Sequence, residues 1–119
     1  FYVPVDKFYK LDKINFDLVS NFFSFGEMTR EGLESYLKSK IILNAKKLYL
    51  VNRFISSPFF ERTYKNDLNI FDYNFNNFDL TYFDIFPIHH YKNIKRRVLG
   101  KDAFRPISSP YFEKIMIRK

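Results

Sequence analysis

TREGLESYLKSKIILNAKKLYLVNRF, residues Thr29–Phe54, is the longest stretch of the chain with a regular spacing of apolar residues. The residues recur at steps of three and four positions, which places them on one face of an α-helix. This face comprises Leu33, Leu37, Ile41, Leu48, Val51 and Ile55. Thr29 is a suitable N-cap, and Glu31 and Glu34 favour the positive end of the helix dipole. The sequence therefore predicts one long helix over residues 29–54, whose apolar face organises the core.

The segments before the long helix predict a short helix and an extended arm. Residues 1–10 have no periodicity of their own, so we expect them to run along the surface. Ile14, Leu18 and Phe22 are four positions apart, as on one side of a short helix. Gly26 interrupts this pattern, and the simplest arrangement is two antiparallel helices with a tight connection.

A change of periodicity after residue 66 predicts a β-hairpin. Aromatic and polar residues alternate there, and Asn76-Asn77 suits the left-handed conformation of a two-residue turn. The predicted register places Phe75 opposite Phe78, Tyr73 opposite Leu80 and Phe71 opposite Tyr82, all on one face. The alternative is an asparagine-rich loop without strand pairing.

Together these elements predict a small α+β fold. It has one long central helix with short helices, one aromatic β-hairpin, an extended N-terminal arm and a basic C-terminal extension. The 119 residues are expected to form a single domain, with an aromatic body over residues 1–91 and the extension over residues 92–119. No uncharged stretch approaches the roughly 20 apolar residues of a membrane-spanning helix. The sequence therefore predicts no transmembrane segment.

The amino-acid composition indicates the type of genome and excludes chemistry that depends on cysteine. Phe, Tyr, Asn, Lys and Ile are abundant, which is typical of an AT-rich genome such as that of an organelle or a parasite. Cysteine is absent, so this sequence forms no disulfide and carries no thiolate nucleophile or cysteine-ligated metal.

Motifs that carry catalysis are also missing. The three glycines form no phosphate-binding loop, and no serine lies in a nucleophile-elbow sequence. His89 and His90 are the only histidines, and adjacent residues point in different directions on a helix or a strand. The sequence therefore predicts no enzyme, metal, cofactor or small-molecule substrate, and we expect the histidines to face solvent or a partner.

One motif occurs twice. RFISSPFFER, residues 53–62, returns as RPISSPYFEK, residues 105–114, with seven identities in ten. One interpretation is a pair of equivalent docking elements, each with an arginine, a Ser-Pro turn that starts a short helix, and an aromatic pair. The candidate docking residues are Arg53, Phe59, Phe60, Arg105, Tyr111 and Phe112. The other interpretation, a coincidence of composition, is favoured by the small number of copies.

The distribution of charge is the most informative functional signal. Residues 1–90 contain 11 basic and 11 acidic residues, whereas residues 91–119 contain nine basic residues against only Asp102 and Glu113. A localised basic segment with aromatic residues is typical of RNA binding, through phosphate contacts and base stacking. The candidate RNA-binding residues are Tyr91, Lys92, Lys95, Arg96, Arg97, Lys101, Phe104 and Arg105. The alternative is a tail that faces water or an acidic protein.

These observations predict a non-enzymatic structural or stably bound component of a large ribonucleoprotein. A ribosome is the expected assembly, with rRNA and neighbouring proteins as partners. The expected location is a mitochondrial or other organellar matrix, or else a cytoplasmic ribosome. The alternative is an accessory subunit of an organellar membrane complex of the respiratory type, with aromatic faces against its neighbours and the basic segment near an anionic membrane surface.

Overall fold

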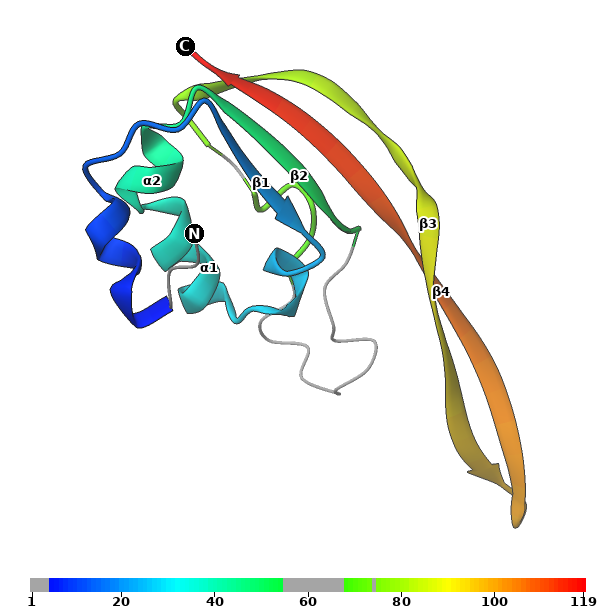
Figure 1. The fold of residues 1–119 in the computed structure, drawn as a ribbon. Coiled ribbons are helices and arrows are strands. Elements are labelled where there is room, and N and C mark those ends of the chain that lie inside the picture. The colour runs from blue at the N-terminus through cyan, green and yellow to red at the C-terminus, as the bar shows by residue number, and fades with distance from the viewer. Residues whose placement is uncertain (1–4, 55–67, 74) are drawn as a thin grey trace.

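The chain forms one four-stranded mixed sheet with helices on one side (Figure 1). The computed structural model describes residues 5–54, 68–73 and 75–119. In chain order the elements are the 3₁₀ helix η1 (Val5–Leu11), β1 (Leu18–Phe22), the 3₁₀ helix η2 (Phe25–Glu27), α1 (Arg30–Leu37), α2 (Lys40–Leu43), β2 (Lys47–Arg53), β3 (Phe78–Val98) and β4 (Lys101–Arg118). The strands lie in the order β1-β2-β4-β3, with β1 parallel to β2 and the other neighbours antiparallel.

The long helix predicted over residues 29–54 is wrong. Its N-cap is confirmed, because the Thr29 hydroxyl accepts a hydrogen bond from Gly32 N at 3.2 Å, but α1 has only eight residues. Ser39 then caps the short α2 through Ile42 N, and the chain continues as β2. β2 pairs with strands on both sides and is buried on both sheet faces. A strand in this position is apolar on both faces, so its sequence resembles that of a buried helix.

The expectations for the N-terminal segment are corrected as well. Residues 18–22 form a strand and not part of a helix, because β1 pairs with the edge of β2 from Leu18↔Lys47 to Phe22↔Val51. This pairing satisfies the backbone groups of β2 that would otherwise form an open edge. The segment predicted as an extended arm contains η1 from residue 5 onward, and residues 1–4 lie outside the described residues.

The hairpin predicted over residues 71–82 is wrong in its pairing. Its turn exists, since Phe78 N donates a hydrogen bond to Phe75 O at 2.9 Å across Asn76-Asn77. The described residues before the turn form a loop, however, and β3 pairs with β4 instead. The reason is the burial of Tyr73 and Phe75, whose side chains lie in the core. In the predicted hairpin both side chains would lie on one exposed face.

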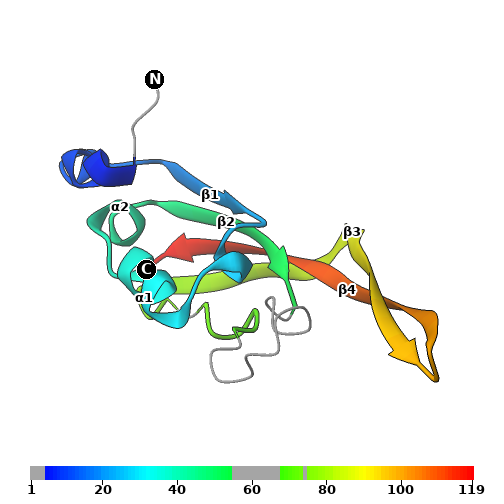
Figure 2. The ribbon, with the colours of Figure 1, turned by 90° about the horizontal axis from the view of Figure 1, so that it is seen from below.

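The core lies between the sheet and a layer that contains α1, α2 and the loop over residues 68–73. Side chains alternate along β2, so that Leu48 and Leu50 point to this layer together with Met116 of β4. The buried cluster comprises Phe25, Leu33, Ile42, Ala45, Leu48, Leu50, Leu68, Ile70, Tyr73, Phe75, Phe78 and Met116. The opposite face of the sheet carries no helix in the described part of the chain (Figure 2).

A two-stranded ribbon extends from the sheet well beyond the helices (Figures 1 and 2). β4 pairs with β2 only over residues 111–117, whereas its pairing with β3 continues for ten more pairs, from His89↔Pro110 to Val98↔Lys101. At about 3.3 Å per residue, the ribbon is about 33 Å long. The radius of gyration is 17.0 Å, against about 13.5 Å for a globular chain of this length. We call residues 89–110 the arm and the other described residues the body.

The base of the arm is irregular. β3 has two extra residues, Pro87 and Ile88, between the pair Phe86↔Tyr111 and the first pair of the arm. Extra residues in one strand bend a ribbon and increase its twist. Proline lacks the N–H that regular pairing requires, and it is tolerated at a bulge because the extra residues there do not take part in the regular pairing. The body and the arm therefore meet at a bulge in β3.

Candidate nucleic-acid interface

The structure brings all eight predicted RNA-binding residues together in the arm. Five of them lie on β3, namely Tyr91, Lys92, Lys95, Arg96 and Arg97, and three lie on β4, namely Lys101, Phe104 and Arg105. The antiparallel register makes Lys95 the partner of Phe104 and Ile94 the partner of Arg105. Residues that are about ten positions apart in the sequence are thereby neighbours in one ribbon.

Most of the basic residues in the last quarter of the chain lie in the arm. It contains six basic residues and one acidic residue, Asp102, a net charge of +5. Three other basic residues of the last quarter belong to the body: Lys114 and Arg118 of β4, and Lys119 directly after it. The predicted basic extension is therefore not a tail, because β4 is a central strand of the sheet and pairs with both β2 and β3.

The tip of the arm is a tight turn. Leu99 and Gly100 have φ angles of 50° and 77°, as a two-residue hairpin turn requires at both central positions. Glycine adopts this conformation without strain, whereas leucine does so only rarely. The side chain of Leu99 is 99% exposed, and Lys101 beside it is exposed too. The arm thus ends in an apolar side chain next to a cation.

The candidate docking residues do not form one surface. Arg53 is buried and forms an ion pair with Glu27. Tyr111 packs against Phe23 on the face of the sheet opposite the helices, with ring centroids 4.6 Å apart. Phe112, the next residue on β4, points to the other face and packs against Phe54, with ring centroids 5.2 Å apart.

The two copies of the repeated motif are also not equivalent where the structure describes them. The second copy, residues 105–114, runs straight through the base of the arm as part of β4, so the turn and helix predicted there are wrong. Backbone pairing with β3 and β2 decides the conformation of this segment. Phe59 and Phe60, with most of the first copy, lie outside the described residues.

Lys114 has a structural role that the sequence did not reveal. Its side chain is buried on the helix side of the sheet, and its ammonium group donates a hydrogen bond to Ile70 O. The Nζ atom lies 5.7 Å from the ring centroids of both Phe71 and Phe83. Burial lowers the pKa of Lys114. The residue therefore fastens the loop over residues 68–73 to the sheet and is not available to RNA.

This burial predicts a pH dependence of stability. The unfolded chain keeps the Lys114 proton up to the ordinary pKa of 10.5, whereas the folded chain releases it at lower pH. The folded state then binds fewer protons, so the free energy of unfolding should rise as the pH increases through that interval. Lys114→Met should lack this rise when the two proteins are compared by urea denaturation at several pH values.

The comparison of wild type with Lys114→Met also controls for other groups that titrate at high pH. Burial raises the pKa of Tyr73, which lowers stability above pH 10 in both proteins alike. The difference between wild type and Lys114→Met therefore isolates the lysine. Equal pH profiles for the two proteins would show that Lys114 titrates as it does in the unfolded chain.

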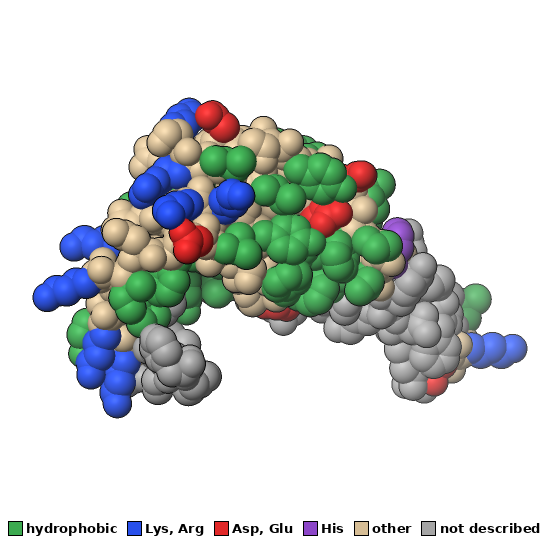
Figure 3. Space-filling model, turned by 45° about the horizontal axis from the view of Figure 1, so that its top comes forward, with side chains coloured by type: hydrophobic (Ala, Val, Ile, Leu, Met, Phe, Trp, Pro, Cys, Tyr) green, Lys and Arg blue, Asp and Glu red, His purple; other side chains and the backbone are tan. Residues whose placement is uncertain are grey.

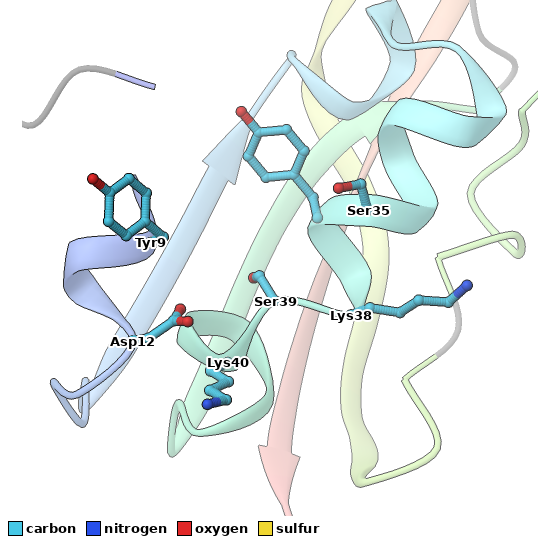
Figure 4. Close-up of a pocket in the computed structure, with 7 residues that line it drawn as sticks. Tyr9, Asp12, Ser35, Lys38, Ser39 and Lys40 are labelled. Atoms are coloured by element: carbon cyan, nitrogen blue, oxygen red, sulfur yellow. The ribbon is translucent and has the colours of Figure 1, made fainter. Parts of the chain in front are cut away.

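A cavity of about 430 Å³ lies between η1 and the junction of α1 and α2 (Figure 4). It is lined by Tyr9, Asp12, Ser35, Tyr36, Lys38, Ser39 and Lys40. Several polar groups here already have partners: Lys38 pairs with Glu34 at 3.7 Å, and the Ser39 hydroxyl caps α2. Figure 4 shows the Lys38 side chain directed away from Tyr9 and Asp12. The labelled side chains do not converge on one point as those of a catalytic site would.

The two histidines lie at the base of the arm. His89 is exposed at the base of the arm, where its Nδ1 lies 3.4 Å from the Ser108 hydroxyl. His90 follows it in β3, opposite Ser109. Across residues 5–54, 68–73 and 75–119, no three His, Asp or Glu residues are grouped so that they could hold a metal ion. In the same residues, no helix has the length and apolar character needed to cross a membrane.

Among the candidate sites in the described residues, the basic arm is therefore the strongest candidate for a functional interface. Comparison of the chain with protein-family models, with curated proteins and with solved structures gives no match.

Proposed function

We propose that the protein is a non-enzymatic component of a large ribonucleoprotein, such as a ribosome of an organelle, and that it binds RNA through the arm. The single observation that supports this proposal is the net charge of +5 on a ribbon of about 33 Å that extends from the body. Intramolecular packing does not require such a ribbon, because an isolated two-stranded hairpin is only marginally stable in water. A polyanion bound to the arm would neutralise its charge.

The chemistry of the arm suits RNA. Lys and Arg neutralise phosphates and release counterions, which supplies most of the non-specific affinity for nucleic acid. Tyr91 and Phe104 provide aromatic rings of the type that stack on unpaired bases. The exposed Leu99 resembles the apolar side chains with which other proteins separate stacked bases. A narrow ribbon can also reach between RNA helices where a globular domain could not enter.

The test is the salt dependence of RNA binding. Polyuridylate and an RNA hairpin serve as single-stranded and duplex probes, with affinity measured between about 50 and 200 mM salt. If four to six phosphates are neutralised, the slope of log affinity against log salt should be roughly −3 to −5, and shallower for the single strand. Reversing Lys95, Arg96 and Arg97 together to Glu should remove about three contacts and flatten the slope accordingly.

Two controls accompany this measurement. Reversal of Lys7, Lys10 and Lys13 to Glu changes the net charge equally but alters the N-terminal part of the body, so it should leave most of the slope unchanged. Replacing Tyr91 or Phe104 by Ala should lower affinity without changing the slope, because stacking releases no counterions. An arm variant that binds as well as wild type, or binding that does not respond to salt, would exclude RNA as the partner of the arm.

A second candidate function is favoured by a different observation. The face of the sheet opposite the helices exposes apolar and aromatic side chains, including Phe22 and Tyr82. Such a face would also suit an accessory subunit of an organellar membrane complex that docks on protein neighbours, with the arm near anionic headgroups. Nuclease treatment distinguishes the two candidates: it should release the protein from a ribonucleoprotein and leave a detergent-solubilised membrane complex intact.

A further inference from the structure

The sheet face opposite the helices, which we call the open face, is an apolar surface with acidic groups within it. Its apolar and aromatic residues are Leu18, Phe22, Phe23, Tyr49, Tyr82, Phe86, Ile115 and Ile117. Leu18 is 55% exposed, Phe22 46% and Tyr82 43%. Figure 3 shows hydrophobic side chains gathered on one face of the molecule, with acidic side chains among them. Apolar side chains exposed together on one face are typical of protein interaction sites.

Two carboxylates lie on the open face, one on the edge strand β3 and one on the neighbouring strand β4. Asp84 of β3 and Glu113 of β4 are register partners, so their side chains emerge side by side. The Tyr49 hydroxyl donates a hydrogen bond to Glu113 Oε2 at 2.7 Å, and this bond raises the pKa of Tyr49. The Tyr82 hydroxyl lies 3.3 Å from Glu113 Oε1 and 3.4 Å from Asp84 Oδ2.

This arrangement leaves negative charge unbalanced. Like charges that face each other across two strands are destabilising, and the single Tyr82 hydroxyl proton can serve only one of the carboxylates at a time. No Lys or Arg among the described residues forms a salt bridge with Asp84 or Glu113. A cation supplied from outside would therefore relieve a repulsion that the folded chain retains.

We propose that the open face docks a partner protein that presents one Lys or Arg within an apolar surface, with the cation placed between Asp84 and Glu113. The surrounding apolar residues would exclude water from the contact, which strengthens a charge-assisted hydrogen bond. This surface is separate from the arm in position and opposite in charge. The proposal therefore holds whether or not the arm binds RNA.

The same charges argue against other occupants. RNA phosphates and anionic lipid headgroups would be repelled by the two carboxylates. A second copy of this chain is also disfavoured, because a two-fold interface brings the same patch of both subunits together. An interface whose two-fold axis passes near these carboxylates would place Asp84 and Glu113 of one subunit beside the same residues of the other.

The experiment selects partners from a phage-displayed library of random peptides on the immobilised full chain. Wild type should enrich peptides that carry Lys or Arg between apolar residues. The double variant Asp84→Asn/Glu113→Gln keeps the shape of the face and removes its charge, and it should bind those same peptides at least about tenfold more weakly in calorimetry. Glu34→Gln is the matched control, because it alters one exposed carboxylate on α1, on the other side of the sheet.

A second variant keeps the proposal testable if the double variant Asp84→Asn/Glu113→Gln does not fold. Phe22→Ser removes an exposed ring from edge strand β1, and it should also weaken peptide binding while the far-UV circular dichroism stays unchanged. Enriched peptides without a basic residue, or equal binding by wild type and the double variant, would overturn the proposal. Concentration-dependent dimerisation that is lost in Phe22→Ser would overturn it as well, in favour of a second copy.

Discussion

Replacing residues 87–110 by Asn-Gly is expected to abolish RNA binding and to leave the body folded. The replacement joins Phe86 to Tyr111, which are already register partners, through a turn that suits antiparallel strands. It removes all six basic residues of the arm and none of the buried core cluster. Since phosphate contacts dominate affinity, polyuridylate binding should fall by at least about a hundredfold at low salt.

Two measurements on the shortened protein separate binding from folding. Fluorescence anisotropy with labelled RNA reports the affinity, and thermal unfolding reports the stability of the body. The replacement removes the backbone hydrogen bond from Phe54 N to Pro110 O (3.0 Å) but none of the buried core cluster, so the melting temperature should remain within about 5 °C of wild type. A shortened protein that folds and still binds RNA would place the RNA site on the body, whereas one that fails to fold would show that the arm supports the sheet.

Leu48→Asp should unfold the protein or nearly so, whereas Leu18→Asp should be tolerated. Leu48 is fully buried in the centre of the sheet, and its partner in β4, Met116, is buried with it. A carboxylate inserted into this apolar cluster would lower the free energy of unfolding by roughly 3–5 kcal/mol, a large part of the total for a domain of this size. Leu18 is on edge strand β1 and is 55% exposed, so the same substitution should change stability by less than about 1 kcal/mol.

Urea denaturation monitored by circular dichroism measures both changes. The pair also tests the observed architecture against the predicted one. In the predicted arrangement, Leu18 belongs to the buried side of a short helix, so both substitutions would be severe. Equal loss of stability in the two variants would therefore contradict the sheet order in which β1 is an edge strand.

The local features of the fold could be predicted from the sequence, and its long-range pairing could not. The Thr29 cap and the turn at Asn76-Asn77 depend on neighbouring residues, and both are present. β2 was mistaken for the second half of a helix because it is buried on both faces by chain segments far away in the sequence. One signal was available: Ser39 is a good N-cap in the middle of the predicted helix, and it marks the point where the chain starts a new element.

The sequence predicted which basic and aromatic residues belong to the candidate interface, but it did not predict that they form a two-stranded arm. Net charge is additive along a chain, so the basic residues of the last quarter could be counted. Their arrangement depends on the register between β3 and β4, which Leu99 and Gly100 set without the Asn-Gly sequence that commonly marks such a turn. The burial of Lys114 and the juxtaposition of Asp84 and Glu113 on the open face depend on the same pairing, so the sequence alone predicts neither.

The bulge at Pro87 and Ile88 sets the direction in which the arm leaves the body. A ribbon of about 33 Å that turns by about 10° at its base moves its tip by about 6 Å, more than the distance between neighbouring strands. Substitutions or deletions at these two positions would therefore redirect the tip while every residue of the tip stayed the same. The position of Leu99 relative to the body therefore depends on two residues at the base of the arm, which can change without any change in the charge of the arm.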